Sequence, residues 1–298
     1  MLDCKFHFIS GLPRSGSTLM AALLRQNPRF HAAMSSPVSL LIEQMLESMG
    51  EDSEHSVFIS TQQKRAIVQG IFTGYYQPQA DKEIVFDTNR RWCSQLPLIR
   101  NLFPYAKVIC CVRNIAWIAD SIERLLRQNT FDVSRLFGSP SERRTVYSRT
   151  EALMQGDRLI GFSYNALKEA FYSENSEILL LVDYEILTQN PDRVMKVIYK
   201  FLGEDFFEHD FENVEYDERE FDKKLNTPGL HKIQSKVEYK PRTTILPPDL
   251  FEQFSNMSFW TEPSQSNANI IISQFKETNL LKFLSDANSP KSCNSSQD

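Results

Sequence analysis

The first segment of the chain whose residue types could do chemistry reads SGLPRSGSTL, over residues 10–19. It follows the apolar run Phe6–Ser10 and opens a predicted helix, Thr18–Gln26. Because a helix N-terminus carries unpaired N–H groups and the positive end of a dipole, this segment favours binding of a phosphate. Gly11 and Gly16 allow the chain to turn tightly around such an anion. We expect the anion to be held by Arg14, Ser15, Gly16, Ser17 and Thr18.

This segment differs from the Walker A phosphate loop, whose pattern is GxxxxGK[ST]. Gly11 and Gly16 have the required spacing and Thr18 stands at the hydroxyl position, but Ser17 replaces the lysine. The cation that the segment does contain is Arg14, three residues before Ser17. We therefore interpret it as a phosphate loop without the Walker lysine. The alternative is an ordinary strand–turn–helix connection with serine caps.

Apolar runs alternate with helical patterns along the chain, and these elements must position the loop. Four runs predict strands, at Phe6–Ser10, Glu83–Phe86, Lys107–Val112 and Ile178–Val182. The last two are apolar on both faces, as expected of central parallel strands covered by helices. Helical spacing is found at Thr18–Gln26, Val38–Met49, Gln62–Tyr75, Trp92–Leu102, Ile115–Arg127, Thr150–Tyr172 and Pro191–Leu202. This alternation predicts an α/β fold with a parallel sheet and right-handed crossovers.

Length and charge restrict the domain organisation and the class of partner. The chain has 298 residues, with 33 Lys and Arg against 38 Asp and Glu, and it lacks the basic footprint of a general nucleic-acid binder. No apolar run approaches the roughly 18 residues that cross a bilayer. Without a linker in the sequence, we predict one domain over residues 1–285, with residues 204–285 as a C-terminal extension or lid. The Ser/Asn-rich residues 286–298 are predicted to be disordered.

The N-terminus and the cysteines predict a cellular location. The first predicted strand begins within a few residues of Met1, which leaves no room for a signal peptide. The five cysteines form no CxxC pair and no zinc-ligand spacing, so we expect reduced thiols that pack as small apolar side chains. Both observations predict a cytoplasmic protein.

Several segments resemble a known family. PRSGSTL after the first strand is similar to the 5′-phosphosulfate loop of sulfotransferases that use 3′-phosphoadenosine 5′-phosphosulfate (PAPS). The resemblance extends over roughly residues 5–260, to a bacterial subfamily in which some members sulfate tyrosine in peptides. The segments that carry it are FISGLPRSGST, VFDTNRRW, VICCVRNIAWIADSIERL, VDYEILTQNP and TPGLH…LPPDL. The resemblance implies a three-layer, P-loop-like α/β fold with a central parallel sheet flanked by helices. It also implies PAPS as co-substrate and no metal.

The resemblance implies a second phosphate site as well. Family members carry an Arg at the end of a later strand and a Ser eight residues on, which together hold the 3′-phosphate. Arg113 and Ser121 have this spacing, and a guanidinium is a planar fork that suits phosphate. Tyr184 matches a position that approaches the nucleotide in relatives, although a Tyr at a strand end is often part of the core. Relatives have a lid at the position of a basic segment that here contains Lys232, Lys236, Lys240 and Arg242. The alternative for this segment is a solvated charged loop.

Sulfuryl transfer depends on positioning, on charge stabilisation and, for a phenol of pKa about 10, on a general base. We expect Arg14 to neutralise charge at the sulfuryl and bridging oxygens. Arg90 or Arg91 lies near the place where relatives have a second cation, and both could equally be surface residues. Several relatives carry a Glu shortly after the second strand, where this chain has residues 31–38 without a carboxylate.

Three residues are candidates for the missing base. Asp87, at the end of the EIVF strand, is the first choice, because the cytosolic branch has a His close to the position of residues 88–89. Glu43, in the predicted helix Val38–Met49, is the second, and His31 is the third. The structural alternatives are that Asp87 caps the next helix and that Glu43 is a solvated helix-face residue.

These observations together predict a PAPS-dependent sulfotransferase. On the resemblance, a tyrosine in a peptide or protein is the first choice of acceptor, and a small hydroxylated metabolite is the second. A P-loop kinase of a small molecule would need a lysine where Ser17 stands and an acidic magnesium ligand, for which Asp87 alone is available. A nucleotide-binding protein without catalysis is the third hypothesis. The oligomeric state is left open.

Overall fold

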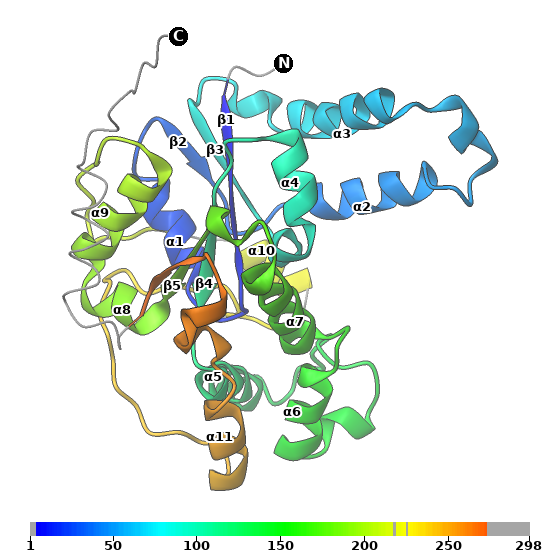
Figure 1. The fold of residues 1–298 in the computed structure, drawn as a ribbon. Coiled ribbons are helices and arrows are strands. Elements are labelled where there is room, and N and C mark those ends of the chain that lie inside the picture. The colour runs from blue at the N-terminus through cyan, green and yellow to red at the C-terminus, as the bar shows by residue number, and fades with distance from the viewer. Residues whose placement is uncertain (1–3, 217–218, 225, 273–298) are drawn as a thin grey trace.

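The computed structural model describes residues 4–216, 219–224 and 226–272. Within these residues the centre is a six-stranded parallel sheet with the strand order β2-β3-β1-β4-β5-β6 (Figure 1). The strands are β1 (Lys5–Gly11), β2 (Phe30–Ala32), β3 (Ile84–Thr88), β4 (Val108–Val112), β5 (Leu179–Asp183) and β6 (Asn269–Ile271). The predicted α/β fold with a central parallel sheet is confirmed.

The four predicted strands correspond to the four inner strands, and the two edge strands have no clear sequence signal. β2 and β6 contain only three residues each, a length at which neither apolar alternation nor an apolar run can be recognised. Both pair in parallel with a longer neighbour, β2 with β3 and β6 with β5. The edges are therefore formed by tertiary pairing on a core that the longer strands build.

Helices cover both faces of the sheet and give three layers (Figure 1). One face packs against α1 (Ser17–Leu24), α8 (Tyr184–Gln189) and α9 (Pro191–Leu202). The other packs against α4 (Leu96–Leu102), α5 (Ile115–Gln128), α7 (Leu159–Tyr172) and α11 (Pro248–Ser255). Neighbouring strand residues enter opposite clusters, as Phe8 and Ile9 of β1 do, because successive side chains of a strand point to opposite faces. None of the described helices is long and apolar enough to cross a bilayer.

Two predicted helices are divided in the structure. The pattern Thr150–Tyr172 consists of α6 (Val146–Met154) and α7, with a turn that contains Gly156 between them. The pattern Trp92–Leu102 consists of the 3₁₀ turn η3 (Arg90–Gln95) and α4, which has Pro97 in its first turn. Apolar spacing continues across both breaks because each pair of pieces packs on the same core cluster.

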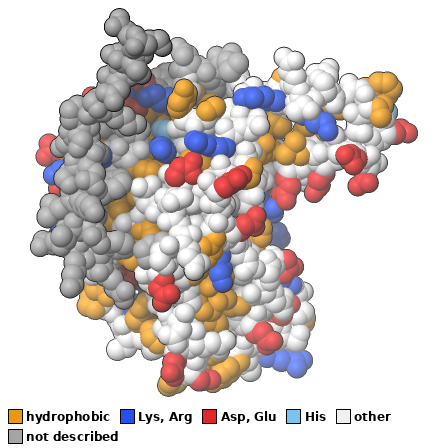
Figure 2. Space-filling model, in the orientation of Figure 1, with side chains coloured by type: hydrophobic (Ala, Val, Ile, Leu, Met, Phe, Trp, Pro, Cys, Tyr) orange, Lys and Arg blue, Asp and Glu red, His pale blue; other side chains and the backbone are white. Residues whose placement is uncertain are grey.

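An arm stands out from the body of the molecule beside β3 (Figures 1 and 2). It is formed by α2 (Val38–Ser48), the 3₁₀ turn η1 (Glu54–Phe58) and α3 (Thr61–Tyr75). Ser60 caps α3 by accepting a hydrogen bond from the backbone N–H of Gln63, while the Gln63 side chain accepts one from the backbone N–H of Ser60. The base of the arm continues the core through Val38 and Phe72, so the two helices are fixed to the sheet.

The chain after α9 contains α10 (Arg219–Lys224), α11 and β6. Two of its stretches pair with each other, because Val214 N–H donates to the carbonyl of Ser235 and Val237 N–H donates to the carbonyl of Phe211. Val214 and Val237 are buried in the cluster that contains α1 and α9. The predicted C-terminal extension thus packs on the body and adds an edge strand. Its residues 273–285 and the predicted disordered tail, 286–298, lie outside the described residues.

Candidate functional site

The loop between β1 and α1 is built from backbone conformations that few residues adopt. Gly11 and Gly16 have φ values of 107° and 93°, and Arg14 has φ 56°. Gly16 is the residue before α1, and no side chain caps the first N–H groups of this helix. These N–H groups can therefore donate to a ligand, and the sequence predicts that this ligand is an anion.

Ser15 shapes the loop instead of facing the pocket. Its side chain is buried, and its hydroxyl lies within hydrogen-bond distance of the carbonyl oxygens of Leu12 and Cys111. Leu12 N–H also donates to the carbonyl of Cys111, at 2.9 Å. The loop is thereby fixed to the end of β4. The expectation that the Ser15 side chain contacts the anion is corrected, since its hydroxyl is used within the protein.

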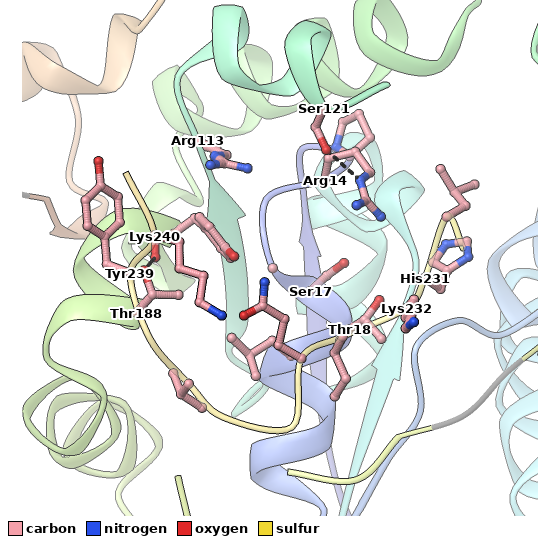
Figure 3. Close-up of a pocket in the computed structure, with 18 of the residues that line it drawn as sticks. Arg14, Ser17, Thr18, Arg113, Ser121, Thr188, His231, Lys232, Tyr239 and Lys240 are labelled. Carbon is pink, nitrogen blue, oxygen red and sulfur yellow. Dashed lines mark hydrogen bonds between the residues drawn. The ribbon is translucent and has the colours of Figure 1, made fainter. Parts of the chain in front are cut away.

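The loop and α5 meet through one side-chain hydrogen bond. Arg14 Nε donates to Ser121 Oγ at 3.1 Å, although the two residues are 107 positions apart in the sequence (Figure 3). Asn114 caps α5 by accepting from Ala116 N–H, which starts the helix directly after Arg113. Ser121 lies about two turns into α5 and so faces the strand end where Arg113 leaves β4. The predicted pair and the loop therefore border one space.

Arg113 is oriented by the residues that follow β5. Its Nε donates to Glu185 Oε1 at 2.9 Å, and its guanidinium carbon lies 4.3 Å from the centre of the Tyr184 ring. The same ring lies against the loop, because a Cβ on Gly16 would come within 2.8 Å of Tyr184 Cδ2. With Nε bonded to Glu185, the terminal nitrogens of the guanidinium are the donors that remain for a phosphate.

A cavity of about 350 Å³ brings the two sites together. All the predicted nucleotide contacts except Ser15 line it, namely Arg14, Gly16, Ser17, Thr18, Arg113, Ser121, Tyr184, Lys236 and Arg242. The other side of the cavity is the basic segment, residues 230–242, which runs beneath the loop from His231 and Lys232 to Tyr239 and Lys240 (Figure 3). Seven cationic side chains line the cavity against one carboxylate, that of Glu238, so the site suits a ligand with several negative charges.

Three of the seven cations form no ion pair within the described residues, namely Arg14, Arg90 and Lys232. Arg14 and Arg90 are the two guanidinium groups among them. Loss of water around the guanidinium, and then the charge of Arg113, lower the pKa of Arg14. The same loss of water, and then the charge of Arg91, lower the pKa of Arg90. Because a guanidinium stays protonated in proteins, these pKa shifts describe an electrostatic penalty that a bound anion would relieve.

The basic segment is held in place by a residue that the sequence analysis did not single out. Asp120, fully buried beside Ser121, accepts from Arg124 Nε at 2.9 Å and from the backbone N–H of Ile245 at 2.7 Å. Arg242, one of the predicted lid residues, lies 2.9 Å from the same carboxylate. Asp120 therefore ties the end of the segment to α5. Its place next to Ser121 was the only signal for it in the sequence.

Asp87, the first choice for the base, lies in the core and not at the cavity. The hydroxyl of Ser36 lies 2.8 and 2.7 Å from its two oxygens, and Tyr76 and Trp92 each donate to one of them at 2.7 Å. Burial raises the pKa of this carboxyl. The placement corrects the expectation that Asp87 meets an acceptor: its oxygens connect β3 to the helices of the arm and to η3.

Asp87→Ala is expected to lower the free energy of unfolding by about 3–5 kcal/mol, because it leaves three buried donors without an acceptor. Asp87→Asn keeps one acceptor oxygen, and its amide can donate to the hydroxyl of Tyr76 or Ser36, so a smaller loss is expected. Chemical denaturation of both variants measures the difference. An Asp87→Asn protein with native stability but turnover lowered about 100-fold would restore Asp87 as the base.

The other two candidates for the base also lie away from the cavity wall. Glu43 forms an ion pair with Arg91 at 2.5 Å, and neither residue lines the cavity. His31 lies on β2 with its ring against Tyr76, and burial lowers its pKa. Of the two adjacent arginines, Arg90 is the one that reaches the cavity. A catalytic role for Glu43 stays a prediction.

The structure adds a second residue pair that the sequence analysis missed. His231 lines the cavity, and its Nδ1 lies 2.6 Å from Oδ1 of Asp222, which belongs to α10. In the sequence, His231 adjoins the basic segment, and Asp222 carries no pattern that distinguishes it. Nine positions separate the two residues and no local pattern links them, so the sequence could not show that their side chains meet.

Comparison with known proteins agrees with this geometry. Residues 7–208 match the family model described as Sulfotransferase family. Protein-tyrosine sulfotransferase 1 of Danio rerio is 26% identical over 213 residues, which are 67% of this chain and 54% of that protein. This chain thus spans about half the length of that relative.

Two solved structures are also similar. The sulfotransferase domain from the Synechococcus PCC 7002 olefin synthase is 20% identical with a TM-score of 0.48, covering 86% of this chain and 94% of that domain. The sulfotransferase domain from the curacin biosynthetic pathway is 15% identical with a TM-score of 0.49, covering 95% and 97%. The family match covers more than half of the chain, including the loop and the Arg113–Ser121 pair. The chain therefore belongs to the sulfotransferase family.

Proposed function

We propose that this protein moves the sulfuryl group of PAPS to the hydroxyl of a tyrosine in a peptide or protein. The observation that carries the proposal is that two anion sites from distant segments border one cavity. One is the loop before α1 with Arg14, and the other is Arg113 with Ser121. A nucleotide with charged groups on both its 5′ and 3′ positions would occupy both sites at once, and the cavity volume of about 350 Å³ lies in the range of ligand pockets.

The residues of the cavity suit this ligand in distinct ways. The first N–H groups of α1 and the hydroxyl of Thr18 would hold the 5′-phosphate. Arg14 and Arg90 would neutralise charge at the sulfuryl group, which PAPS supplies already activated. Arg113 and Ser121 would hold the 3′-phosphate. Lys236 and Arg242 would add positive charge from the basic segment, which crosses the opening as a lid would.

A tyrosine acceptor is supported by the similarity to a protein-tyrosine sulfotransferase. The alternative acceptor is a small hydroxylated metabolite. Incubation with ³⁵S-labelled PAPS tests both, with a tyrosine peptide, the same peptide carrying Phe in place of Tyr, and 4-nitrophenol. We expect label on the tyrosine peptide and none on its Phe counterpart. Label on 4-nitrophenol alone would favour the small-molecule acceptor, and label on the Phe peptide would exclude tyrosine as the site.

Nucleotide preference provides a test that needs no acceptor. At a concentration 100-fold above its Kd, 3′,5′-ADP is expected to add about 2.7 kcal/mol to the stability of the folded state and to raise Tm by roughly 4 °C. AMP at the same concentration lacks the group that Arg113 and Ser121 hold, so its shift should be much smaller. A thermal-unfolding series with 3′,5′-ADP, AMP and ATP–Mg²⁺ measures this. A larger shift with ATP–Mg²⁺ would contradict the proposal and favour a P-loop kinase.

A further inference from the structure

His231 and Asp222 form a two-point contact at the wall of the cavity. The Nδ1 atom of His231 lies 2.6 Å from Oδ1 of Asp222, and the backbone N–H of His231 donates to Oδ2 at 3.0 Å. The side chains are 17% and 7% exposed. Because both oxygens are used, the carboxylate fixes the position of the histidine backbone as well as the orientation of its ring.

The contact also selects one tautomer of the imidazole. A carboxylate accepts hydrogen bonds, so Nδ1 must carry the proton that it donates to Asp222. The basic lone pair of the neutral ring is then on Nε2. Burial is the largest cause that lowers the pKa of His231 below its ordinary value of 6.5, with Asp222 raising it and Arg90 and Arg14 lowering it again. The ring is therefore largely neutral, and able to accept a proton, at pH 7.

The position of His231 places it at the loop end of the cavity. Figure 3 shows His231 and Lys232 on one side of Arg14, with Arg113, Tyr239 and Lys240 on the other. The residues whose charges act on His231 include Arg90 and Arg14, neither of which has an ion pair among the described residues. If Arg113 holds the 3′-phosphate, His231 lies toward the other end of the nucleotide, where the sulfuryl group would be.

We propose that His231, oriented by Asp222, is the general base that takes the proton from the acceptor hydroxyl. This inference rests on the proposed function. In the step, the acceptor oxygen forms a bond to sulfur while the bond from sulfur to the bridging oxygen of PAPS breaks. The hydroxyl proton goes to Nε2 of His231, and 3′,5′-ADP leaves with the electron pair of the broken bond. No further reactant is needed.

The competing proton acceptors of the site are less well placed. Asp87 is buried in the core and Glu43 is paired with Arg91, and neither lines the cavity. Glu238 does line it, but this carboxylate lies 2.6 Å from Lys240 and is 38% exposed, and the ammonium group lowers its pKa. His231 combines a fixed orientation, a lone pair at neutral pH and a place beside Arg14.

Substitution of the base tests the proposal, with PAPS as donor and 4-nitrophenol and a tyrosine peptide as acceptors. His231→Gln retains an N–H group for Asp222 and is expected to lower kcat about 10²- to 10⁴-fold. The Kd for 3′,5′-ADP should stay within about threefold of the wild-type value, because the base does not hold the nucleotide. His55→Gln is the matched control, since His55 is an exposed histidine on the arm, with a side chain 74% exposed.

Two further measurements separate a base from a structural role. His231→Ala leaves space for imidazole, and added imidazole is expected to restore part of the lost kcat. Asp222→Asn presents an amide N–H to Nδ1, which favours the tautomer with its lone pair on the wrong nitrogen. We expect this variant to lose at least about tenfold in kcat while 3′,5′-ADP binding is kept.

The pH dependence gives an independent readout. The charged groups that act on His231 are Asp222 from α10, Arg90 from η3 and Arg14 from the loop. The acid limb of kcat/KM is therefore expected below pH 6.5 in the wild-type protein, with activity rising as His231 loses its proton. The acid limb of kcat should lie at higher pH, because the bound nucleotide offsets the charges of Arg14 and Arg90.

His231→Gln with kcat within about threefold of wild type and an unchanged acid limb overturns the proposal, as does a larger loss in Glu238→Gln than in His231→Gln. A wild-type protein that binds 3′,5′-ADP but sulfates neither phenol also overturns it. A wild-type protein that does not bind 3′,5′-ADP overturns the proposed function itself.

Discussion

Arg113→Ala is expected to weaken binding of 3′,5′-ADP by about 100-fold or more while it changes the affinity for AMP by less than about threefold. Hydrogen bonds to a charged group contribute roughly 1.5–3 kcal/mol each, and the two terminal nitrogens of Arg113 can form two of them with a 3′-phosphate. AMP has no group at that position, so the substitution should remove the preference between the two nucleotides.

The structure shows why this effect should be large and local. Arg113 is only 12% exposed, and Glu185 and the Tyr184 ring hold it in one orientation, so little side-chain entropy is lost when it binds. Isothermal titration of both nucleotides measures the ratio of their Kd values. Arg113→Lys keeps a cation for Glu185 and distinguishes loss of the planar fork from loss of charge. Arg193→Ala, on the exposed side of α9, is the control.

A retained preference for 3′,5′-ADP in Arg113→Ala would contradict the assignment. The 3′-phosphate would then bind elsewhere in the cavity, and the pairing of Arg113 with Ser121 would be structural. Equal weakening of both nucleotides would instead indicate that the loop had been disturbed through Tyr184 and Gly16. Denaturation curves of the variant, measured alongside, show whether the folded state is intact.

Gly11→Ala is expected to destabilise the folded protein by about 3–5 kcal/mol. A Cβ at this position would lie 2.2 Å from the carbonyl oxygen and 2.7 Å from the nitrogen of Cys111, and φ is +107°. Because both contacts are with backbone atoms of the central strand β4, no side-chain rotation can relieve them. The two strands would have to move apart where the loop begins, so nucleotide binding should weaken as well.

Gly70→Ala is the matched control, and we expect it to raise the free energy of unfolding instead of lowering it. Gly70 lies inside α3, where a Cβ would meet nothing within 4 Å. Replacing glycine by alanine in a helix stabilises by roughly 0.5–1 kcal/mol. Urea denaturation of both variants measures the two changes on the same scale. A Gly11→Ala protein as stable as the wild type would mean that the loop and β4 are not in the close contact that the structure describes.

Much of the fold could be predicted because its signals are local in sequence. The runs in β4 and β5 are buried on both faces, so their apolar composition alone identified them as inner strands of a parallel sheet. The loop before α1 could be found in the same way, since strand, glycines and helix start are consecutive. The break between α6 and α7 and the edge strands β2 and β6 could not be found, because pairing and packing with distant residues decide them.

The base candidates show the limit of the same reasoning. Asp87 stands at a strand end, which in a parallel sheet is a favoured position for a site, but whether a strand-end carboxylate faces a cavity or the core depends on what covers it. Here Tyr76 and Trp92, from other elements, enclose it. His231 and Asp222 carried no pattern of their own, since a charged run and a lone histidine in a loop are both ordinary.

The sequence by itself determined the parallel α/β sheet, the glycine-containing loop before α1 and the spacing of Arg113 and Ser121, because each depends on residues that are close together along the chain. Only the tertiary structure decided which polar groups share the cavity and which are enclosed. In the folded protein Arg14 contacts Ser121 and Asp222 contacts His231. Asp87 and Ser15 are buried. The physical reason is that the burial and hydrogen bonding of a side chain depend on every segment that packs around it. Those segments are distant in the sequence, so a local pattern does not identify them.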